Sequence, residues 1–375
     1  MSEPAKIVIP AAMRPADGRF GSGPTKIRDA QLEALAAAGR GPLGTSHRQA
    51  PVRNVVQRVR EGLATLFGLP DDYLVVLSNG GTTAFWDVAA FGLLSGRTQH
   101  LSFGEFSAKF ANVTRSAPWL PEPSVIASEP GTHPVPRAES GVDAYAFTHN
   151  ETSTGVAMPI RRVAGADDGA LVLVDATSAA GGIAVDPSQF DVYYFAPQKC
   201  FGSDGGLWLA LLSPAAVERA ARIAVSDRYI PEFLSLQTAI EQARLQQTYN
   251  TPAVATLILL AEQVDWMLSQ GGMAWTTERT ATSSGILYNW ADKSPVATPF
   301  VADAGDRSPV VVTIDFADHI QASALSAVLR ANGIVDTDSY RKLGRNQLRI
   351  GTFPAIEPAD VEALTTCMDY VLERL

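Results

Sequence analysis

Residues 171–199 read LVLVDATSAAGGIAVDPSQFDVYYFAPQK, and two short apolar runs stand out in them. The first run, Leu171 to Val174, leads into Asp175, and the second, Val192 to Phe195, is followed four residues later by Lys199. Short runs without polar residues predict strands buried on both faces, as in the parallel sheet of an α/β protein. Because ligands of open α/β sheets bind beyond the carboxyl ends of the strands, we expect Asp175 and Lys199 to lie at one binding edge.

The sequence around this segment predicts the rest of a large α/β domain. Further apolar runs predict strands at Tyr73 to Leu77, Ala144 to Phe147 and Leu207 to Leu212. Apolar residues at three- and four-residue steps predict a helix after Pro51, and the segments 84–94 and 214–270 are also mostly helical in pattern. Strands that alternate with helical stretches indicate a sheet with helices on both faces.

The last third of the chain predicts a second, smaller α/β domain. Strands are expected at Val310 to Phe316 and Leu348 to Ile350, and helices at Ile320 to Ala331 and Pro358 to Leu375. A chain of 375 residues also exceeds the usual size of a single hydrophobic core. We therefore predict an N-terminal arm at residues 1–19, a large domain at 20–270 and a small domain at 271–375.

Composition and charge exclude several classes of function. The formal net charge is −9, and the chain has no run of Lys or Arg that would bind a nucleic acid. The apolar stretches are shorter than the ~20 residues of a membrane helix, and the opening MSEPAKIVIP lacks the apolar region of a signal peptide. The two cysteines, Cys200 and Cys367, fit a reducing compartment. We expect a cytoplasmic protein with small-molecule substrates and without a metal, membrane or nucleic-acid partner.

A lysine and a carboxylate at one sheet edge suit pyridoxal 5′-phosphate (PLP) chemistry. Lys199 would hold the cofactor as a Schiff base and then move a proton at the substrate α-carbon, and Asp175 would keep the pyridine nitrogen protonated. Taken singly, Asp175 reads as a turn residue and Lys199 as a surface lysine. The glycines that follow the lysine, at 202, 205 and 206, favour the paired site.

Three other segments are candidate cofactor contacts, each with a plainer alternative. The turn Ser78 to Thr83 has two glycines before a helix, which suits a phosphate, although many strand-to-helix turns carry glycines for geometry alone. Phe106, expected in a loop, would stack on the ring or belong to the core. The triplet Asn150-Glu151-Thr152 would bond the cofactor or form an Asx-type turn.

Two clusters of cationic residues indicate an anionic substrate. His47-Arg48 lies in a Gly/Ser-rich segment, and Tyr340-Arg341-Lys342 is followed closely by Arg345 and Arg349. Arginines bind carboxylates and phosphates through paired hydrogen bonds, so several together suit a doubly anionic substrate. For Lys342 and Arg345 we favour a solvated basic loop.

Taken together, these residues resemble the phosphoserine aminotransferases, in the branch found in actinobacteria, which belong to the class V group of fold-type I PLP enzymes. The matching residues occur in the same order as in the family, from about residue 20 to about residue 355. The matching residues are Gly23-Pro24, Ser46-His47-Arg48, Gly80-Gly81, Asn150-Glu151-Thr152, Asp175, Gln198-Lys199 and Tyr249-Asn250-Thr251-Pro252.

The resemblance implies a large domain with a mostly parallel seven-stranded sheet, a smaller C-terminal domain, and a homodimer with shared active sites. It implies that Lys199 and Asp175 are catalytic and that Phe106 replaces a ring-stacking tryptophan. The other implied contacts are Thr152 and Gln198 with the cofactor ring, Gly81 and Thr82 with its phosphate, and Asn250 and Thr251 from the partner subunit. The implied substrate contacts are His47 and Arg48 from the partner subunit, Arg341, which would bind the substrate's phosphate, and Arg349, which would bind its α-carboxylate. Thr82 and Tyr340 stand where many members carry arginine and histidine.

The implied reaction is reversible amino transfer between O-phospho-L-serine and 2-oxoglutarate, giving 3-phosphohydroxypyruvate and L-glutamate in L-serine biosynthesis. Whether 4-phosphohydroxy-L-threonine of pyridoxine biosynthesis is also used stays open. The nearest alternative is an alanine– or serine–glyoxylate aminotransferase, whose smaller substrates would not need Arg48. A cysteine desulfurase is disfavoured because neither cysteine lies on an evident catalytic loop. From other classes, we keep a nucleotide-binding oxidoreductase and a non-catalytic PLP-binding regulator as alternatives.

Overall fold

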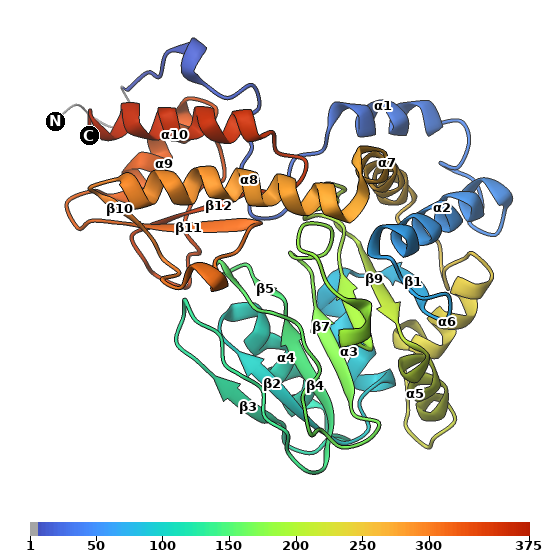
Figure 1. Ribbon diagram of the computed structural model, residues 1–375. Helices are drawn as coiled ribbons and strands as arrows, with labels where there is room; N and C mark the ends of the chain where they lie inside the picture. The colour runs from blue at the N-terminus through green and yellow to red at the C-terminus, as the bar shows by residue number, and fades with distance from the viewer. Residues whose placement is uncertain (1–6) are drawn as a thin grey trace.

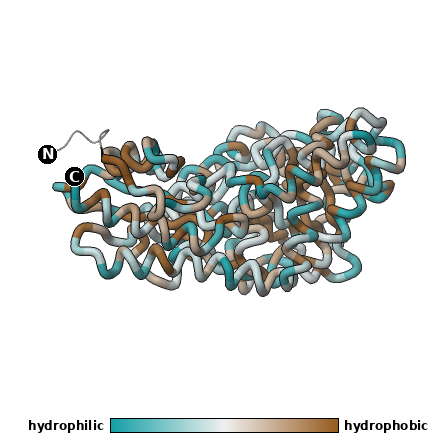
Figure 2. Tube along the Cα trace, turned by 90° about the horizontal axis from the view of Figure 1, so that it is seen from above, coloured by the Kyte–Doolittle hydropathy of each residue, from teal (hydrophilic) through white to brown (hydrophobic). Residues whose placement is uncertain are grey.

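The computed structural model describes residues 7–375, which form a large lobe and a small lobe joined by the long helix α8 (Figure 1). The large lobe is built on a seven-stranded sheet, and the small lobe, drawn in orange and red, on a three-stranded sheet. Figure 2 shows both lobes from above, with hydrophobic segments in each.

The seven-stranded sheet has the strand order β1-β9-β8-β7-β4-β2-β3. Strands β3, β2, β4, β7 and β8 are parallel, whereas β9 is antiparallel to both of its neighbours. This arrangement confirms the predicted α/β fold with a mostly parallel sheet. The strands are Leu74–Asn79 (β1), Arg97–Ser102 (β2), Ser124–Ala127 (β3), Val142–Thr148 (β4), Leu171–Asp175 (β7), Val192–Phe195 (β8) and Leu207–Leu212 (β9).

Helices cover both faces of this sheet. Val172 and Val174 of β7 enter one hydrophobic core, while Leu171 and Leu173 enter a second core on the opposite face. Because every residue of β7 is buried, the strand needs apolar side chains at successive positions, which is the pattern that predicts it. Helices α2 and α7 contribute to the first core and α3, α4, α5 and α6 to the second. Their bounds are Ala50–Phe67 (α2), Gly81–Gly92 (α3), Glu105–Ser116 (α4), Pro214–Ala224 (α5), Leu236–Arg244 (α6) and Val254–Gln270 (α7); α1, Asp29–Ala38, packs on α7.

The small lobe has its own hydrophobic core. Its antiparallel sheet has the order β10-β11-β12; helices α8 and α9 pack on the sheet, and α10 packs on α8 and α9. Helix α8 is shared, since it also packs against α7 of the large lobe. The elements are Ala297–Pro299 (β10), Val311–Phe316 (β11), Gln347–Gly351 (β12), Gly272–Lys293 (α8), Ala322–Ala331 (α9) and Pro358–Leu372 (α10).

The predicted division at residue 270 lies at Gly271, between α7 and α8. Of the predicted N-terminal arm, residues 1–6 lie outside the described part of the chain. In the remainder of the arm, Ile7 and Ile9 pack into the small-lobe core, and Arg19 forms a bridge with Val335. The three-part division itself stays a prediction.

Two elements near the site differ from the sequence-based expectation. Strand β2 is not predicted because its centre is polar: Thr98 and His100 are buried and bonded to each other at 3.0 Å. Phe106 lies in the first turn of α4, so the expectation of a loop there is wrong. The start of α4 is capped by Glu151 and Ser153, which are distant in sequence, and no local pattern reveals such a cap.

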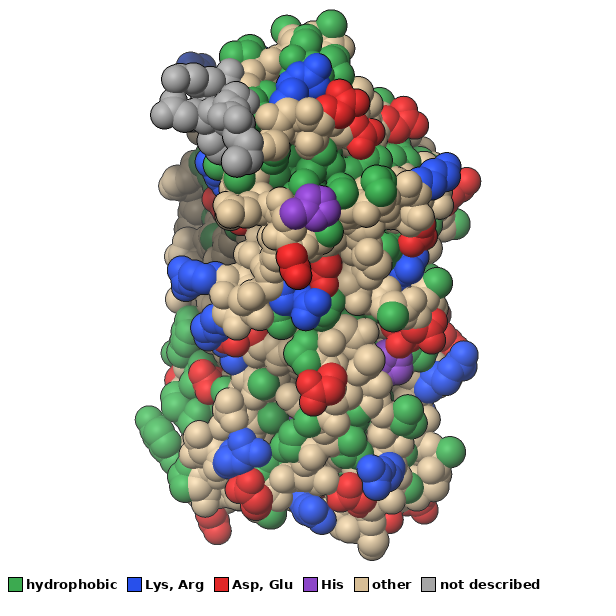
Figure 3. Space-filling view, turned by 90° about the vertical axis from the view of Figure 1, so that its left-hand side faces the viewer, with side chains coloured by type: hydrophobic (Ala, Val, Ile, Leu, Met, Phe, Trp, Pro, Cys, Tyr) green, Lys and Arg blue, Asp and Glu red, His purple; other side chains and the backbone are tan. Residues whose placement is uncertain are grey.

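On the face drawn in Figure 3, acidic and basic side chains are interspersed. None of the helices within residues 7–375 combines the length and the apolar character needed to cross a membrane.

Candidate active site

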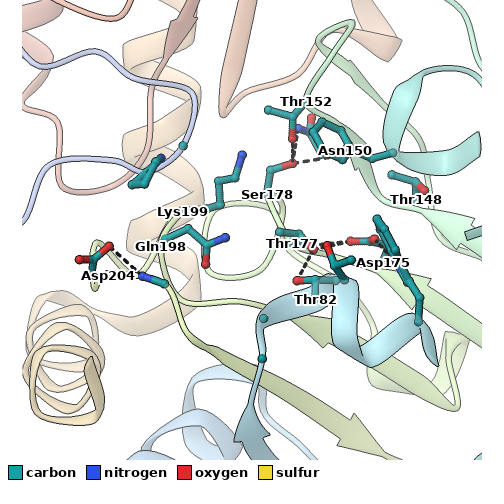
Figure 4. A pocket seen from close by; sticks show the side chains of 18 residues that line it. Thr82, Thr148, Asn150, Thr152, Asp175, Thr177, Ser178, Gln198, Lys199 and Asp204 are labelled. Atoms are coloured by element: carbon teal, nitrogen blue, oxygen red, sulfur yellow. Dashed lines mark hydrogen bonds between the residues drawn. The ribbon is translucent and has the colours of Figure 1, made fainter. Parts of the chain in front are cut away.

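A cavity of about 460 Å³ lies beyond the carboxyl ends of β4, β7 and β8. The structure places seven of the predicted site residues in its lining: Gly81, Thr82, Phe106, Thr152, Asp175, Gln198 and Lys199. Figure 4 shows Asp175 and Lys199 on opposite sides of Thr177 and Ser178.

Asp175 is the last residue of β7, and its carboxylate is held by three hydrogen bonds. The hydroxyl and the backbone N–H of Thr177 donate to Oδ1 at 2.6 and 3.0 Å, and Nε1 of Trp86 donates to Oδ2 at 3.2 Å. Burial raises the pKa of Asp175, while the bonds from Thr177 and Trp86 oppose the rise. A buried carboxylate held in this way is well placed to receive a cation.

Lys199 follows β8 on a tight turn and is buried at 8% exposure. Its Nζ donates to the carbonyl oxygen of Ser22 at 2.6 Å. A Cβ atom at Gly23 would lie 2.3 Å from this Nζ, so residue 23 must be glycine for the lysine to keep its place. Burial, and then the positive charge of Arg349, lower the pKa of Lys199 to about 8. A substantial fraction of the amine is therefore neutral near physiological pH.

The glycine turn leads into helix α3, and the N-terminus of this helix lies at the cavity. Gly80 and Gly81 have φ values of 124° and 72°, a conformation that favours glycine. The N-cap Gly80 offers no side-chain cap to the first-turn N–H groups, and the residues of this turn, Gly81 to Thr83, line the cavity at the positive end of the helix. The hydroxyl groups of Thr82 and Thr177 lie 2.9 Å apart and link this turn to Asp175. The turn thus has the features of an anion site.

On the other side of the cavity, Ser178 organises two polar residues. Its Oγ accepts from Nδ2 of Asn150 and from the hydroxyl of Thr152, both at 2.8 Å (Figure 4). Two buried oxygens on the cavity lining, Oδ1 of Asn150 and Oε1 of Gln198, have no partner within residues 7–375. Such oxygens need a donor, which a bound ligand would provide.

Phe106, which lines the cavity, lies next to Tyr340 of the small lobe. The ring centroids of Phe106 and Tyr340 lie 6.2 Å apart, and the guanidinium of Arg349 lies 5.1 Å from the Tyr340 ring centroid. Arg349 does not line the cavity but lies beside it, donating to the carbonyl oxygen of Thr152 at 3.1 Å. Arg341 is exposed and away from the cavity lining.

Four predicted site residues form a separate cluster outside the cavity of their own chain. Nδ1 of His47 lies 3.1 Å from Oγ1 of Thr251, and Arg48 donates to the carbonyl oxygen of Tyr249 at 3.1 Å. Asn79, next to the glycine turn, donates to Oδ1 of Asn250 at 3.1 Å. The cluster therefore lies beside the end of β1, next to the glycine turn.

Lys342 and Arg345 are exposed, as expected for a basic loop, yet each has a carboxylate partner. Lys342 pairs with Glu105 at the start of α4, and Arg345 pairs with Asp315. The first of these ion pairs joins the small lobe to the large lobe one residue from Phe106.

Several lining residues were not singled out in the sequence: Trp86, Thr148, Thr177, Ser178 and Asp204. Thr177 carries a usable signal, because a threonine two residues after an aspartate often bonds back to it. Trp86 lies four residues after Thr82 and hence on the same side of α3. The others carry no comparable signal.

The cavity fits PLP by three complementary features. It has a carboxylate for a cationic ring nitrogen at Asp175, an amine at Lys199, and a positive helix end for a phosphate at Gly81. The unpartnered oxygens of Asn150 and Gln198 would face polar atoms of the ring.

Comparison with known proteins gives a consistent result. The class V aminotransferase family matches residues 138–337. A phosphoserine aminotransferase of Nocardioides sp. is 63% identical over 368 residues, covering 98% of this chain and 98% of the relative.

Two solved structures share the fold. A phosphoserine aminotransferase from Cytophaga hutchinsonii superposes with a TM-score of 0.87 at 23% identity, over 94% of this chain and 99% of that chain. A PLP-bound phosphoserine aminotransferase from Trichomonas vaginalis gives a TM-score of 0.79 at 17% identity, over 94% and 99% of the two chains.

Proposed function

The chain belongs to the class V aminotransferases, among the phosphoserine aminotransferases, and we propose on this basis that it transfers amino groups between O-phospho-L-serine and 2-oxoglutarate with PLP as cofactor. The observation that carries the proposal is the presence of Asp175, Lys199 and the glycine turn in one cavity. Family membership argues against the nucleotide-binding oxidoreductase and the non-catalytic regulator. Among aminotransferases, the 63% identical relative favours phosphoserine over glyoxylate-type substrates.

The residues that would hold PLP follow from the lining of the cavity. When bound, PLP acts as an electron sink that makes the α-proton of the substrate removable. Asp175 would pair with the ring nitrogen, and Gly81 and Thr82 would bind the phosphate. Phe106 would cover the ring. Thr152 and Gln198 would bond its polar atoms.

Lys199 would have two roles. Its amine would bond covalently to the cofactor, and once displaced by substrate it would carry a proton to and from the substrate α-carbon. A pKa of about 8 suits this second role, because a general base works best when its pKa is close to the working pH.

We propose that cationic residues around the cavity bind the two anionic groups of the substrate. Arg349, beside Thr152, would take the α-carboxylate. Arg341, in the loop before β12, would take the distal phosphate or γ-carboxylate together with His47 and Arg48. One site would thus serve two dianionic partners in turn, and the kinetics would be ping-pong.

We further propose a homodimer in which His47, Arg48, Asn250 and Thr251 enter the cavity of the partner subunit. In support, these residues cluster together outside the cavity of their own chain. Next to them, Tyr249 and Leu245 are exposed at 39% and 52%, and such apolar surface suits an interface. A cytoplasmic location remains a prediction, consistent with two unpaired, buried cysteines.

The test is an absorption spectrum of the purified protein beside Lys199→Ala, before and after addition of phosphoserine. We expect a visible cofactor band in the wild type that bleaches with phosphoserine and recovers with 2-oxoglutarate. In Lys199→Ala the band should be shifted and should not cycle. A band that responds to L-alanine but not to phosphoserine would overturn the substrate assignment, and absence of any band after incubation with PLP would overturn the cofactor assignment.

A further inference from the structure

Glu151 is a fully buried carboxylate that does not line the cavity. It lies on the short strand β5, Asn150–Glu151, between two residues that do line it. Because side chains alternate along an extended chain, Asn150 and Thr152 face the cavity while Glu151 points the other way, toward α4. A charge this deeply buried needs compensation, and α4 supplies it.

The compensation comes from the first turn of α4. The carboxylate accepts from the backbone N–H groups of Phe106 and Ser107 at 3.1 and 2.9 Å, and from the hydroxyl of Ser107 at 2.9 Å. Ser153 adds two bonds, since its hydroxyl donates to Glu151 at 2.7 Å and accepts from the N–H of Glu105 at 3.1 Å. The N-cap residue, Gly104, has no side chain that could do this. Glu151 and Ser153 therefore replace the local cap, and a negative charge at a helix N-terminus is favourable.

The contact leaves the first turn little freedom. A Cβ atom at Gly104 would lie 2.4 Å from Cγ of Glu151, so the backbone at the start of α4 packs closely against the Glu151 side chain. The residue fixed most directly by this contact is Phe106, whose own N–H is bonded to the carboxylate and whose ring lines the cavity.

We propose that Glu151 is a positioning residue for the cofactor: it holds the first turn of α4 so that the Phe106 ring covers the cavity. The inference rests on the proposed function, in which Phe106 lies over the PLP ring. Glu151 acts through Phe106, so its contribution to cofactor binding depends on the presence of that ring.

A double-mutant cycle on the full chain tests this dependence, with the Kd for PLP measured by titration after removal of cofactor. Stacking on an aromatic ring contributes enough that Phe106→Ala should raise the Kd about 3–10-fold. We expect Glu151→Gln to raise the Kd by a similar factor in the wild-type background and by less than about twofold in the Phe106→Ala background. Equal factors in both backgrounds, or no change in either, would overturn the inference.

Two further measurements separate positioning from a loss of folding. Glu105→Gln removes a carboxylate from the same turn of α4 on its outer side, where it pairs with Lys342, and should leave the Kd for PLP unchanged. Thermal unfolding without cofactor is recorded for each variant, and Glu151→Asp replaces Glu151→Gln in the cycle if the latter does not fold. If wild type itself fails to bind PLP, the proposed function fails; if it binds and the cycle is additive, only the role of Glu151 fails.

Discussion

The indole N–H of Trp86 in helix α3 donates a hydrogen bond of 3.2 Å to Asp175 at the end of β7. The helix that presents its N-terminus to the cavity is thereby tied to the carboxylate on the neighbouring strand. A hydrogen bond to the charged form of an acid lowers its pKa, and here it opposes the effect of burial.

Trp86→Phe should therefore raise the pKa of Asp175 and weaken its pairing with a cationic ring. Loss of a hydrogen bond to a charged group costs about 1.5–3 kcal/mol, so we expect kcat/KM for phosphoserine to fall roughly 10–100-fold. The acid limb of the pH–rate profile should move to higher pH. Tyr145→Phe is the control, since Tyr145 is buried elsewhere in the large-lobe core. An unchanged acid limb in Trp86→Phe would contradict this account.

The pKa of Lys199 predicts how cofactor attachment depends on pH. Only the neutral amine attacks an aldehyde, and the neutral form dominates above the pKa. With a pKa of about 8, the rate of PLP attachment to the cofactor-free chain should rise with pH, with its midpoint at about pH 8. Arg349→Gln removes a positive neighbour and should move the midpoint upward. Stopped-flow absorbance measures both, and a wild-type midpoint near that of an ordinary lysine would refute the assignment.

Gly23→Ala should prevent the Lys199 side chain from keeping its position. The new Cβ would lie 2.3 Å from Nζ of Lys199, at a backbone φ of +125°. Gly44→Ala is the matched control, since its φ is +73° but, within residues 7–375, only its own chain neighbours lie within 4 Å of the added carbon. We expect both variants to lose about 1–2 kcal/mol of stability from backbone strain. Only Gly23→Ala should lose the visible cofactor band, and retention of a normal band there would show that the lysine can move aside.

Arg219 should matter for stability and not for catalysis. It is buried at the edge of the sheet opposite the cavity, pairing with Asp143 at 2.7 Å and donating to the carbonyl oxygen of Gly169 at 3.0 Å. Arg219→Met leaves a largely buried carboxylate without its counter-ion, so the free energy of unfolding should fall by about 3 kcal/mol. In denaturant titrations the exposed Arg222→Met, one turn away on α5, should differ little from wild type. A large loss of kcat in the folded Arg219→Met variant would contradict the prediction that Arg219 matters for stability and not for catalysis.

Parts of the fold that depend on local pattern are predictable from the sequence. Strands β8 and β9 are predicted with the bounds that the structure has, because their apolar runs are uninterrupted. The strand-end positions of Asp175 and Lys199 likewise place them at one edge. Strand β2 is missed because buried polar residues such as His100 satisfy each other only in three dimensions.

The rest of the site depends on contacts between distant segments. The helix that carries Phe106 begins where it does because Glu151, 45 positions later, caps it. The ion pair between Lys342 and Glu105 joins the two lobes, and no spacing in the sequence predicts it. The role proposed for the cluster around His47 requires a second subunit, and spacing within one chain does not predict contacts between subunits.

Helix α8 has a mechanical consequence for the enzyme. Its 22 residues, about 33 Å long, are continuous from the packing against α7 to the packing against α10. A continuous helix resists bending, so a change in its packing against α7 would move the small lobe as one body. The loop that bears Tyr340 and Lys342 would then move relative to α4 together with the rest of the small lobe.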